Sequence, residues 1–126
     1  MLNLSLTVDG LPELIKKLNT TEAEMVPELN KALDVSAQAT LSRLQTNTPV
    51  DTGNLRSSER ITNPAPLLAN VGPDSSKAPY AYYVEVGHHT RSGSWVPGQF
   101  FIEKTALEMN KNIQDIFINF IRNLLK

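Results

Sequence analysis

Apolar and polar residues alternate at the start of the chain and then recur at helical spacing. Every second residue from Leu2 to Val8 is apolar, which is typical of a half-buried strand. Asp9-Gly10 ends this pattern. Apolar residues three and four positions apart over residues 11–18 predict a short helix, which Asn19-Thr20 ends.

A long helix is predicted next, beginning at Glu22 or Glu24 and ending at Gln45. Thr21 and Glu24 have the spacing of a capping box, which satisfies unpaired amides at a helix start. Pro27 leaves a second start open, near Val26, because proline is costly beyond the first turn. One stripe of this helix is apolar and predicts packing on a sheet: Val26, Leu29, Leu33, Ala37, Thr40, Leu41 and Leu44.

The middle of the chain predicts a turn followed by a hairpin. Pro49 cannot continue the long helix, and residues 51–54 have turn chemistry. Residues 55–62 are expected to be extended, residues 63–66 break the chain, and the apolar segment 67–72 forms the second strand.

The segment 78–87 fits either a strand or a helix. Tyr82 to Val86 has strand propensity, whereas Pro79 near the start and Gly87 at the end match the ends of a helix. We favour a short helix. Residues 88–98 are polar and contain glycine, which predicts a loop, and an apolar stripe over residues 99–124 predicts a final long helix.

These elements predict a single α+β domain over residues 1–126, with a small, mostly antiparallel sheet packed against a central and a C-terminal long helix. The composition is that of a globular protein, with 40% hydrophobic and 20% charged residues. A net charge of −1 argues against strong nucleic-acid binding, and the lack of cysteine excludes disulfides and thiolate metal sites. No signal peptide or membrane-spanning stretch is recognised, so we expect synthesis in the cytoplasm and no membrane contact.

The sharpest enzymatic signal is Asp51-Thr52-Gly53, a triplet found in retroviral-type aspartic proteases. There, a dimer brings two such aspartates together. Here the triplet follows Thr46 to Val50 instead of an apolar strand, and long helices lie at both ends of an otherwise mixed chain. We interpret Asp51 as a structural turn residue, and a small dimeric protease remains the alternative function.

Other candidate chemistry is weaker. His88 and His89 with Glu85 resemble metal ligands, but neighbouring strand residues point in opposite directions and no further ligand is nearby. Arg91 and Trp95 suit either stacking on a nucleic-acid base or anchoring a protein contact, and the low basic charge favours the protein contact. Phosphate-binding loops and a GxSxG serine are absent from the sequence, so no enzyme activity and no cofactor are expected.

Three stretches taken in order carry a family resemblance. They are Thr48 to Ser58, Ala78 to Gly87, and Val96 to Ile102 leading into the last helix. Together they resemble the small tail-component proteins of long-tailed bacteriophages, whose pattern is P-x-x-T-G-x-L-R-x-S, Y-A-x-x-V-E-x-G and a Pro–aromatic step into a helix. The sequence departs at Val86, where an aromatic residue is usual, and at Gly98-Gln99, which separate proline from phenylalanine.

The resemblance implies a structural subunit of the virion neck, either a head–tail connector or a tail-completion protein. Its implied partners are further copies in a ring, commonly six-fold, and the adjoining head-connector and tail-tube proteins, with genome DNA at most passing through the lumen. The third hypothesis is a cytoplasmic adaptor protein of cellular origin.

The motif residues expected to be structural are Pro49, Asp51, Thr52, Gly53, Leu55, Arg56, Tyr80, Ala81, Val84, Glu85 and Gly87. Arg56 and Glu85 are expected to form an ion pair. We expect the subunit interface to contain Arg91, Trp95, Phe100 and Phe101.

Overall fold

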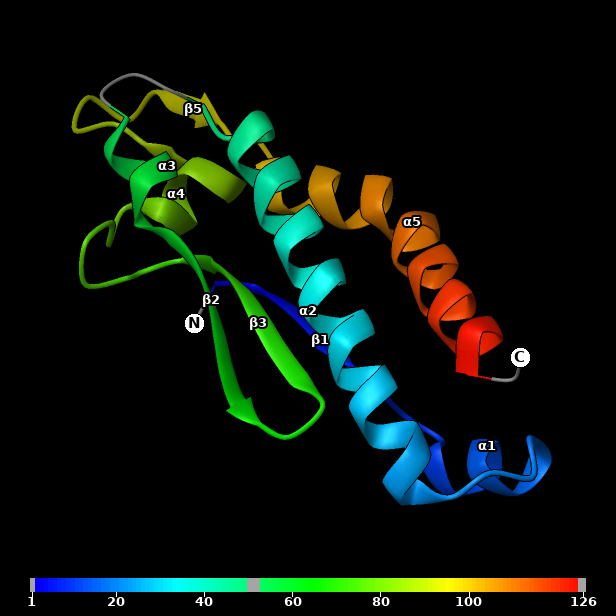
Figure 1. Cartoon of the computed structure of the whole chain (residues 1–126). Coiled ribbons are helices and arrows are strands. Elements are labelled where there is room, and N and C mark those ends of the chain that lie inside the picture. The colour runs from blue at the N-terminus through cyan, green and yellow to red at the C-terminus, as the bar shows by residue number, and fades with distance from the viewer. Residues whose placement is uncertain (1, 50–52, 125–126) are drawn as a thin grey trace.

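The computed structural model describes residues 2–49 and 53–124. In chain order its elements are β1 (Leu4–Thr7), α1 (Leu11–Lys17), α2 (Glu22–Asn47), α3 (Asn54–Ser58), β2 (Glu59–Ala65), β3 (Leu68–Pro73), α4 (Ala81–Val86), β4 (Gly87–His89), β5 (Trp95–Pro97) and α5 (Phe101–Leu124). The predicted α+β class is confirmed: two long helices pack with a small antiparallel sheet (Figure 1).

The main sheet has three strands in the order β1-β3-β2, all antiparallel. Leu4, Val71 and Ile61 share one row across the sheet and face the core, as alternation predicts. The next row, through Ser5 and Asn70, is polar, and the Ser5 hydroxyl donates to Asn70 Oδ1 over 2.7 Å. One face of the sheet is therefore apolar and the other polar.

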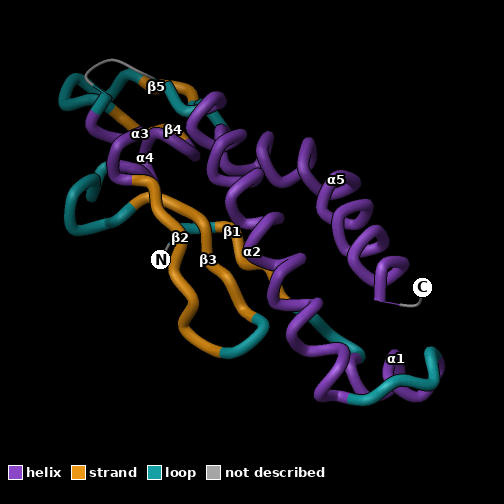
Figure 2. The backbone as a smooth tube through the Cα atoms, in the orientation of Figure 1, coloured by secondary structure: helices purple, strands orange, loops and turns teal. Residues whose placement is uncertain are grey.

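Helix α2 runs along the apolar face of the sheet, and α5 packs along α2 (Figures 1 and 2). The N-cap half of the capping box is confirmed, because Thr21 Oγ1 accepts the amide of Glu24 at 3.2 Å. The alternative start near Val26 is wrong: the helix begins at Glu22 and keeps Pro27 inside it. The capping box and the packing of the long apolar stripe outweigh the one backbone bond that proline removes.

The expectation that residues 55–62 are extended is wrong in its first half, because Asn54–Ser58 form the short helix α3. The amide of Ser57 donates to the Gly53 carbonyl, and the hydroxyls of Ser57 and Ser58 donate back to the carbonyls of Asn54 and Leu55. Such local hydrogen bonds from serine hydroxyls stabilise a helical turn that the spacing of apolar residues does not predict.

The β2–β3 hairpin is confirmed, but its first strand extends to Ala65, through the predicted break at residues 63–66. The pairing shifts register between Thr62 and Ala65. Pro64 is tolerated because β2 lies at the edge of the sheet, where a missing amide costs no ladder bond.

The short helix favoured over residues 78–87 is confirmed as α4. The loop predicted over residues 88–98 is wrong, since β4 and β5 pair antiparallel with His88 opposite Val96. Together α3, α4 and this second hairpin gather at the end of the molecule where α2 ends and α5 begins (Figure 1). We call this region the junction end.

Candidate functional site

The first motif forms the edge of the junction end. Pro49 follows α2, and Gly53 has a φ of 79°, the left-handed region that favours glycine. Leu55 is buried in the core, whereas Arg56 is exposed. Asp51 and Thr52, the first two residues of the triplet considered for a protease, lie outside the described residues.

The second motif lies beside the first and is tied to it by Asn54. The Asn54 amide nitrogen donates to the Tyr80 hydroxyl over 2.8 Å and to the Lys77 carbonyl over 3.1 Å. Ala81 is buried in the core, and Val84 is half-buried against it. Two motifs more than twenty residues apart in sequence thus form one surface.

Glu85 connects α4 to α5. Its carboxylate oxygens accept the amides of Ile102 at 2.9 Å and Glu103 at 3.0 Å, in the first turn of α5. Unpaired amides of a helix start bind anions well, and here a side chain from another element satisfies them. The expected ion pair between Arg56 and Glu85 is wrong: no such pair forms between these two described residues. The backbone of α5 occupies both carboxylate oxygens instead.

Two glycines allow close packing at the second hairpin, Gly98 against α4 and Gly87 against β5. A Cβ on Gly98 would meet the Glu85 carbonyl oxygen at 2.3 Å, and one on Gly87 would meet Trp95 Cζ2 at 2.6 Å. The amide of Gln99 donates to the Val84 carbonyl at 2.8 Å, which satisfies an end of α4. The hairpin therefore has a defined position on the helix.

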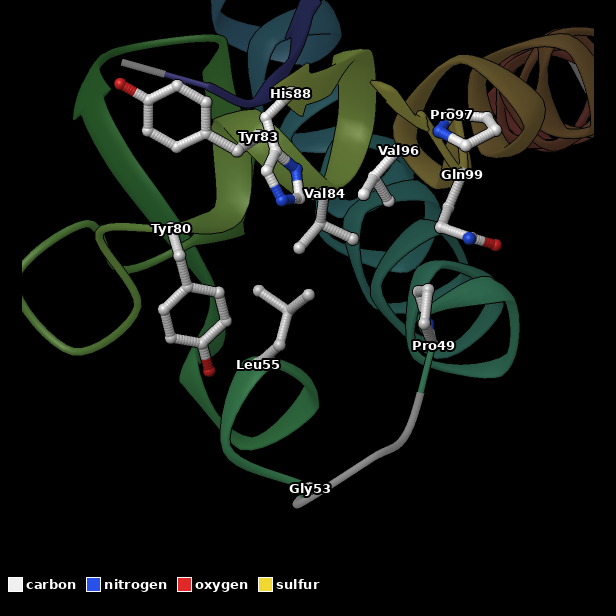
Figure 3. Close-up of a pocket in the computed structure, with 10 residues that line it drawn as sticks. All are labelled: Pro49, Gly53, Leu55, Tyr80, Tyr83, Val84, His88, Val96, Pro97 and Gln99. Carbon is white, nitrogen blue, oxygen red and sulfur yellow. The ribbon is translucent and has the colours of Figure 1, made fainter. Parts of the chain in front are cut away.

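A pocket of about 230 Å³ opens where the motifs meet. Figure 3 shows Leu55, Val84 and Val96 facing a common space from three different segments. The complete lining is Pro49, Gly53, Leu55, Tyr80, Tyr83, Val84, His88, Val96, Pro97 and Gln99. The pocket is apolar at its centre, with hydroxyl, imidazole and amide groups among its lining side chains.

The sequence was also compared with known families and proteins. The model of the HK97-gp10-like family, described as bacteriophage HK97-gp10 tail components, matches residues 12–87, more than half of the chain. The chain belongs to this family. No curated protein and no solved structure gives a match.

The family match covers the first two motifs of this tail component and ends at Gly87, where the second hairpin begins. Residues 88–126 therefore hold β5, the rest of β4 and α5 outside the matched range. The pocket joins both parts, because Pro49, Leu55 and Val84 lie inside the match and Val96 and Gln99 lie beyond it.

The predicted interface residues divide into exposed and buried positions. Arg91 is exposed, Trp95 is 54% exposed and Phe100 is 47% exposed. Phe101 is wrong as a contact residue, because it is 1% exposed and packs in the core of the same chain. The helix begins at Phe101, which directs that side chain inward, while Phe100 precedes the helix with a φ of 49°.

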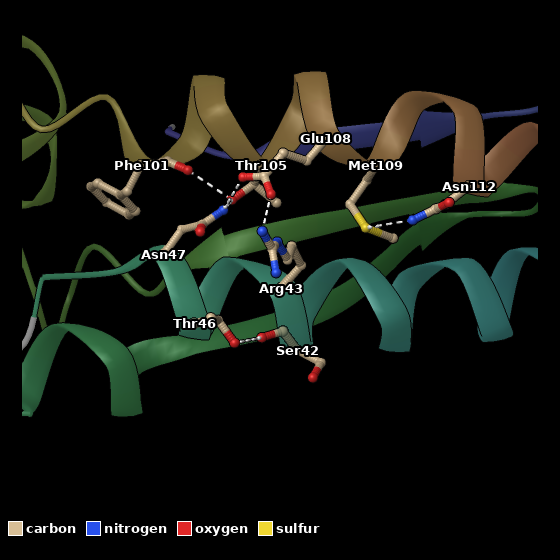
Figure 4. A network of polar contacts seen from close by, with 9 residues as sticks. All are labelled: Ser42, Arg43, Thr46, Asn47, Phe101, Thr105, Glu108, Met109 and Asn112. Atoms are coloured by element: carbon tan, nitrogen blue, oxygen red, sulfur yellow. Dashed lines mark hydrogen bonds and ion pairs between the residues drawn. The ribbon is translucent and has the colours of Figure 1, made fainter.

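On the other side of the junction end, α2 and α5 share a polar network (Figure 4). The Arg43 guanidinium forms an ion pair with Glu108, and the Asn47 amide donates to Glu108 Oε1 and to Thr105 Oγ1, each at 3.0 Å. The hydrogen bond from Arg43, with that from Asn47, holds the pKa of the Glu108 carboxyl below its ordinary value. The end of α2 is therefore fixed to the start of α5.

Glu59 is a buried carboxyl that the sequence analysis did not select. Thr48 Oγ1 lies 2.6 Å from both the Leu44 carbonyl oxygen and Glu59 Oε2, yet a hydroxyl has one proton to donate. A protonated Glu59 satisfies both contacts by donating to Thr48, which donates to Leu44. Burial raises the pKa of Glu59 from 4.5 to about 7, against the lowering effects of Thr48 and Arg56. Strand alternation could have indicated that Glu59 is buried, since it lies two residues before Ile61, which faces inward.

Within residues 2–49 and 53–124, no group of three or more histidine, cysteine, aspartate or glutamate side chains is arranged to hold a metal ion. His88 lines the pocket, while His89 packs against Trp95 with ring centroids 5.0 Å apart. In the same described part of the chain, no helix is both long and apolar enough to cross a membrane.

Proposed function

We propose that this tail component is a structural subunit of the phage neck, a head–tail connector or tail-completion protein that assembles into a closed ring, commonly of six copies. Its work is assembly and not catalysis. The adjoining head-connector and tail-tube proteins are its partners, and genome DNA passes at most through the lumen. Family membership supports the tail assignment.

The observation that carries the ring proposal is the exposed apolar surface at the junction end. Tyr82, Tyr83, Trp95 and Phe100 are each about half exposed there. Large exposed apolar patches mark contact sites, and tryptophan and tyrosine are favoured anchors of protein interfaces. A subunit that stays alone gains nothing from displaying them.

The second half of α5 offers more uncovered surface. Among its described residues after Met109, none is buried, although the stripe includes Ile113, Phe117 and Phe120. Burying a side chain of this kind contributes about 1.5–3 kcal/mol. Ile113 and Phe117 already pack in part against the core, so contact with a neighbouring copy along α5 would recover the remaining part of that free energy.

The test is electron microscopy of purified particles, together with a deletion of the gene. We expect a closed ring of this chain at the neck, and particles without joined heads and tails when the gene is deleted. Complementation with the wild-type gene controls for effects on neighbouring genes. Absence of the chain from particles, with normal joined particles made by the deletion strain, would contradict the proposal.

A further inference from the structure

The second hairpin has two different faces. Its register pairs His88 with Val96 and His89 with Trp95. Because side chains alternate along strands, His88 and Val96 face one side and His89 and Trp95 the other. The first pair lines the pocket (Figure 3), and in the second pair the two rings meet edge to face. One thin hairpin therefore carries a pocket on one face and an exposed indole on the opposite face.

The Trp95 indole is held in position while remaining 54% exposed. Its Cζ2 lies over Gly87, where a Cβ would approach it to 2.6 Å, and the His89 ring packs against it at an interplanar angle of 64°. A side chain that is already ordered loses little entropy when a partner covers it. The indole is thus held on one side by its own chain, while about half of its surface is left exposed to a partner.

The pocket has the size and chemistry to accept one large apolar side chain. Its volume of about 230 Å³ is below the roughly 300–1,000 Å³ of sites for drug-sized ligands. Leu55, Val84, Val96 and Pro97 provide apolar contact. An indole N–H usually finds a partner when buried, and the hydroxyl, imidazole and amide groups of the lining side chains include possible acceptors.

We infer that Trp95 of one copy enters the pocket of the next copy. This inference deepens the proposed ring and rests on it. An exposed side chain and an apolar pocket on different faces of one molecule give a head-to-tail contact, which closes into a ring when the rotation between copies allows. A two-fold contact would require one self-complementary patch, whereas here the two halves lie on opposite faces of the hairpin. The second copy is therefore the occupant that the geometry favours.

Site-directed cross-linking tests this contact, because the chain contains no cysteine. Ser94→Cys places a thiol beside Trp95, and Gln99→Cys places one in the pocket lining. Particles assembled from a mixture of these two variants should yield a disulfide-linked dimer on mild oxidation. Leu107→Cys, which is 74% exposed on α5, replaces Ser94→Cys in the matched control and should give none.

The dependence on the indole gives a second readout. Adding Trp95→Ala to the Ser94→Cys chain should lower the cross-linked fraction about tenfold or more, while Trp95→Phe should keep most of it. The circular dichroism spectra of the free variants should match that of the wild type, because half of the Trp95 side chain is exposed.

The possible results separate this inference from the proposed function. If the chain forms a ring but no disulfide links residue 94 of one copy to residue 99 of another, the inference is overturned and the proposed ring still stands. A link from Gln99→Cys to a different neck protein also overturns it. Absence of the chain from particles contradicts the neck role, and a link in concentrated purified protein would then still support the contact.

Discussion

Replacing Glu85 should loosen the connection between α4 and α5. The side chain is 6% exposed and accepts the amides of Ile102 and Glu103. Glu85→Ala leaves both amides without this partner, and an unsatisfied buried donor costs about 1–3 kcal/mol. The bond to Ile102 is buried and that to Glu103 is partly buried, so water replaces some of the second. We expect a loss of roughly 3 kcal/mol in the free energy of unfolding.

Glu85→Gln gives the intermediate case, because it keeps one acceptor oxygen but turns an amide group toward the second N–H. We expect a loss of about 1–2 kcal/mol, including the weaker interaction of a neutral group with the helix dipole. Asp115→Ala is the matched control: it removes an exposed carboxylate from the same α5 and should change stability by no more than about 0.5 kcal/mol.

Urea unfolding followed by circular dichroism measures these differences, and hydrogen exchange locates them. The amides of residues 102 and 103 should exchange faster in Glu85→Ala than in the wild type, while amides in the middle of α2 change only with global stability. If both Glu85 variants match Asp115→Ala in stability and exchange, the carboxylate does not hold the start of α5.

Two further predictions concern Glu59 and Gly87. The folded state keeps a proton on Glu59 that the unfolded chain releases near pH 4.5. The free energy of unfolding should therefore fall by roughly 2–3 kcal/mol as pH rises from 4.5 to about 7. Urea titrations should show this pH dependence in the wild type, and an equal dependence in Glu59→Gln would contradict it. Gly87→Ala adds a Cβ 2.6 Å from Trp95 at a φ of 92°. It should lower the free energy of unfolding more than Gly93→Ala does, where φ is 90° and the space around the Cβ is open. The fluorescence of the single tryptophan should shift only in Gly87→Ala, and equal losses of stability in the two variants would refute the close contact.

Elements with one continuous apolar face were predictable from the sequence. The strand at residues 4–7, α2 and α5 each bury a periodic set of side chains. The spacing of apolar residues therefore predicts the burial that stabilises these elements. Helix α4 was predictable for a different reason: Pro79 and Gly87 mark its ends even though its residues favour strands.

The second hairpin was missed because its stability does not come from apolar spacing. Its strands have three residues each and depend on Gly98 lying close to α4 and on Gly87 lying close to β5. The partner of Glu85 was missed for a related reason. Every residue has a backbone amide, so nothing in the side chains of Ile102 and Glu103 identifies them as the groups that bind the carboxylate.

The junction end shows why the motif residues occur together. Gly87, Gly98 and the buried carboxylate of Glu85 contribute little apolar surface of their own, and each constrains where the hairpin or α5 lies. What they position is an exposed Trp95 on one face and an open pocket on the other. Backbone constraints that hold exposed apolar groups in place reduce the entropy lost on association. The same residues that stabilise the fold at this end therefore also fix the positions of the apolar groups that the proposed ring would bury.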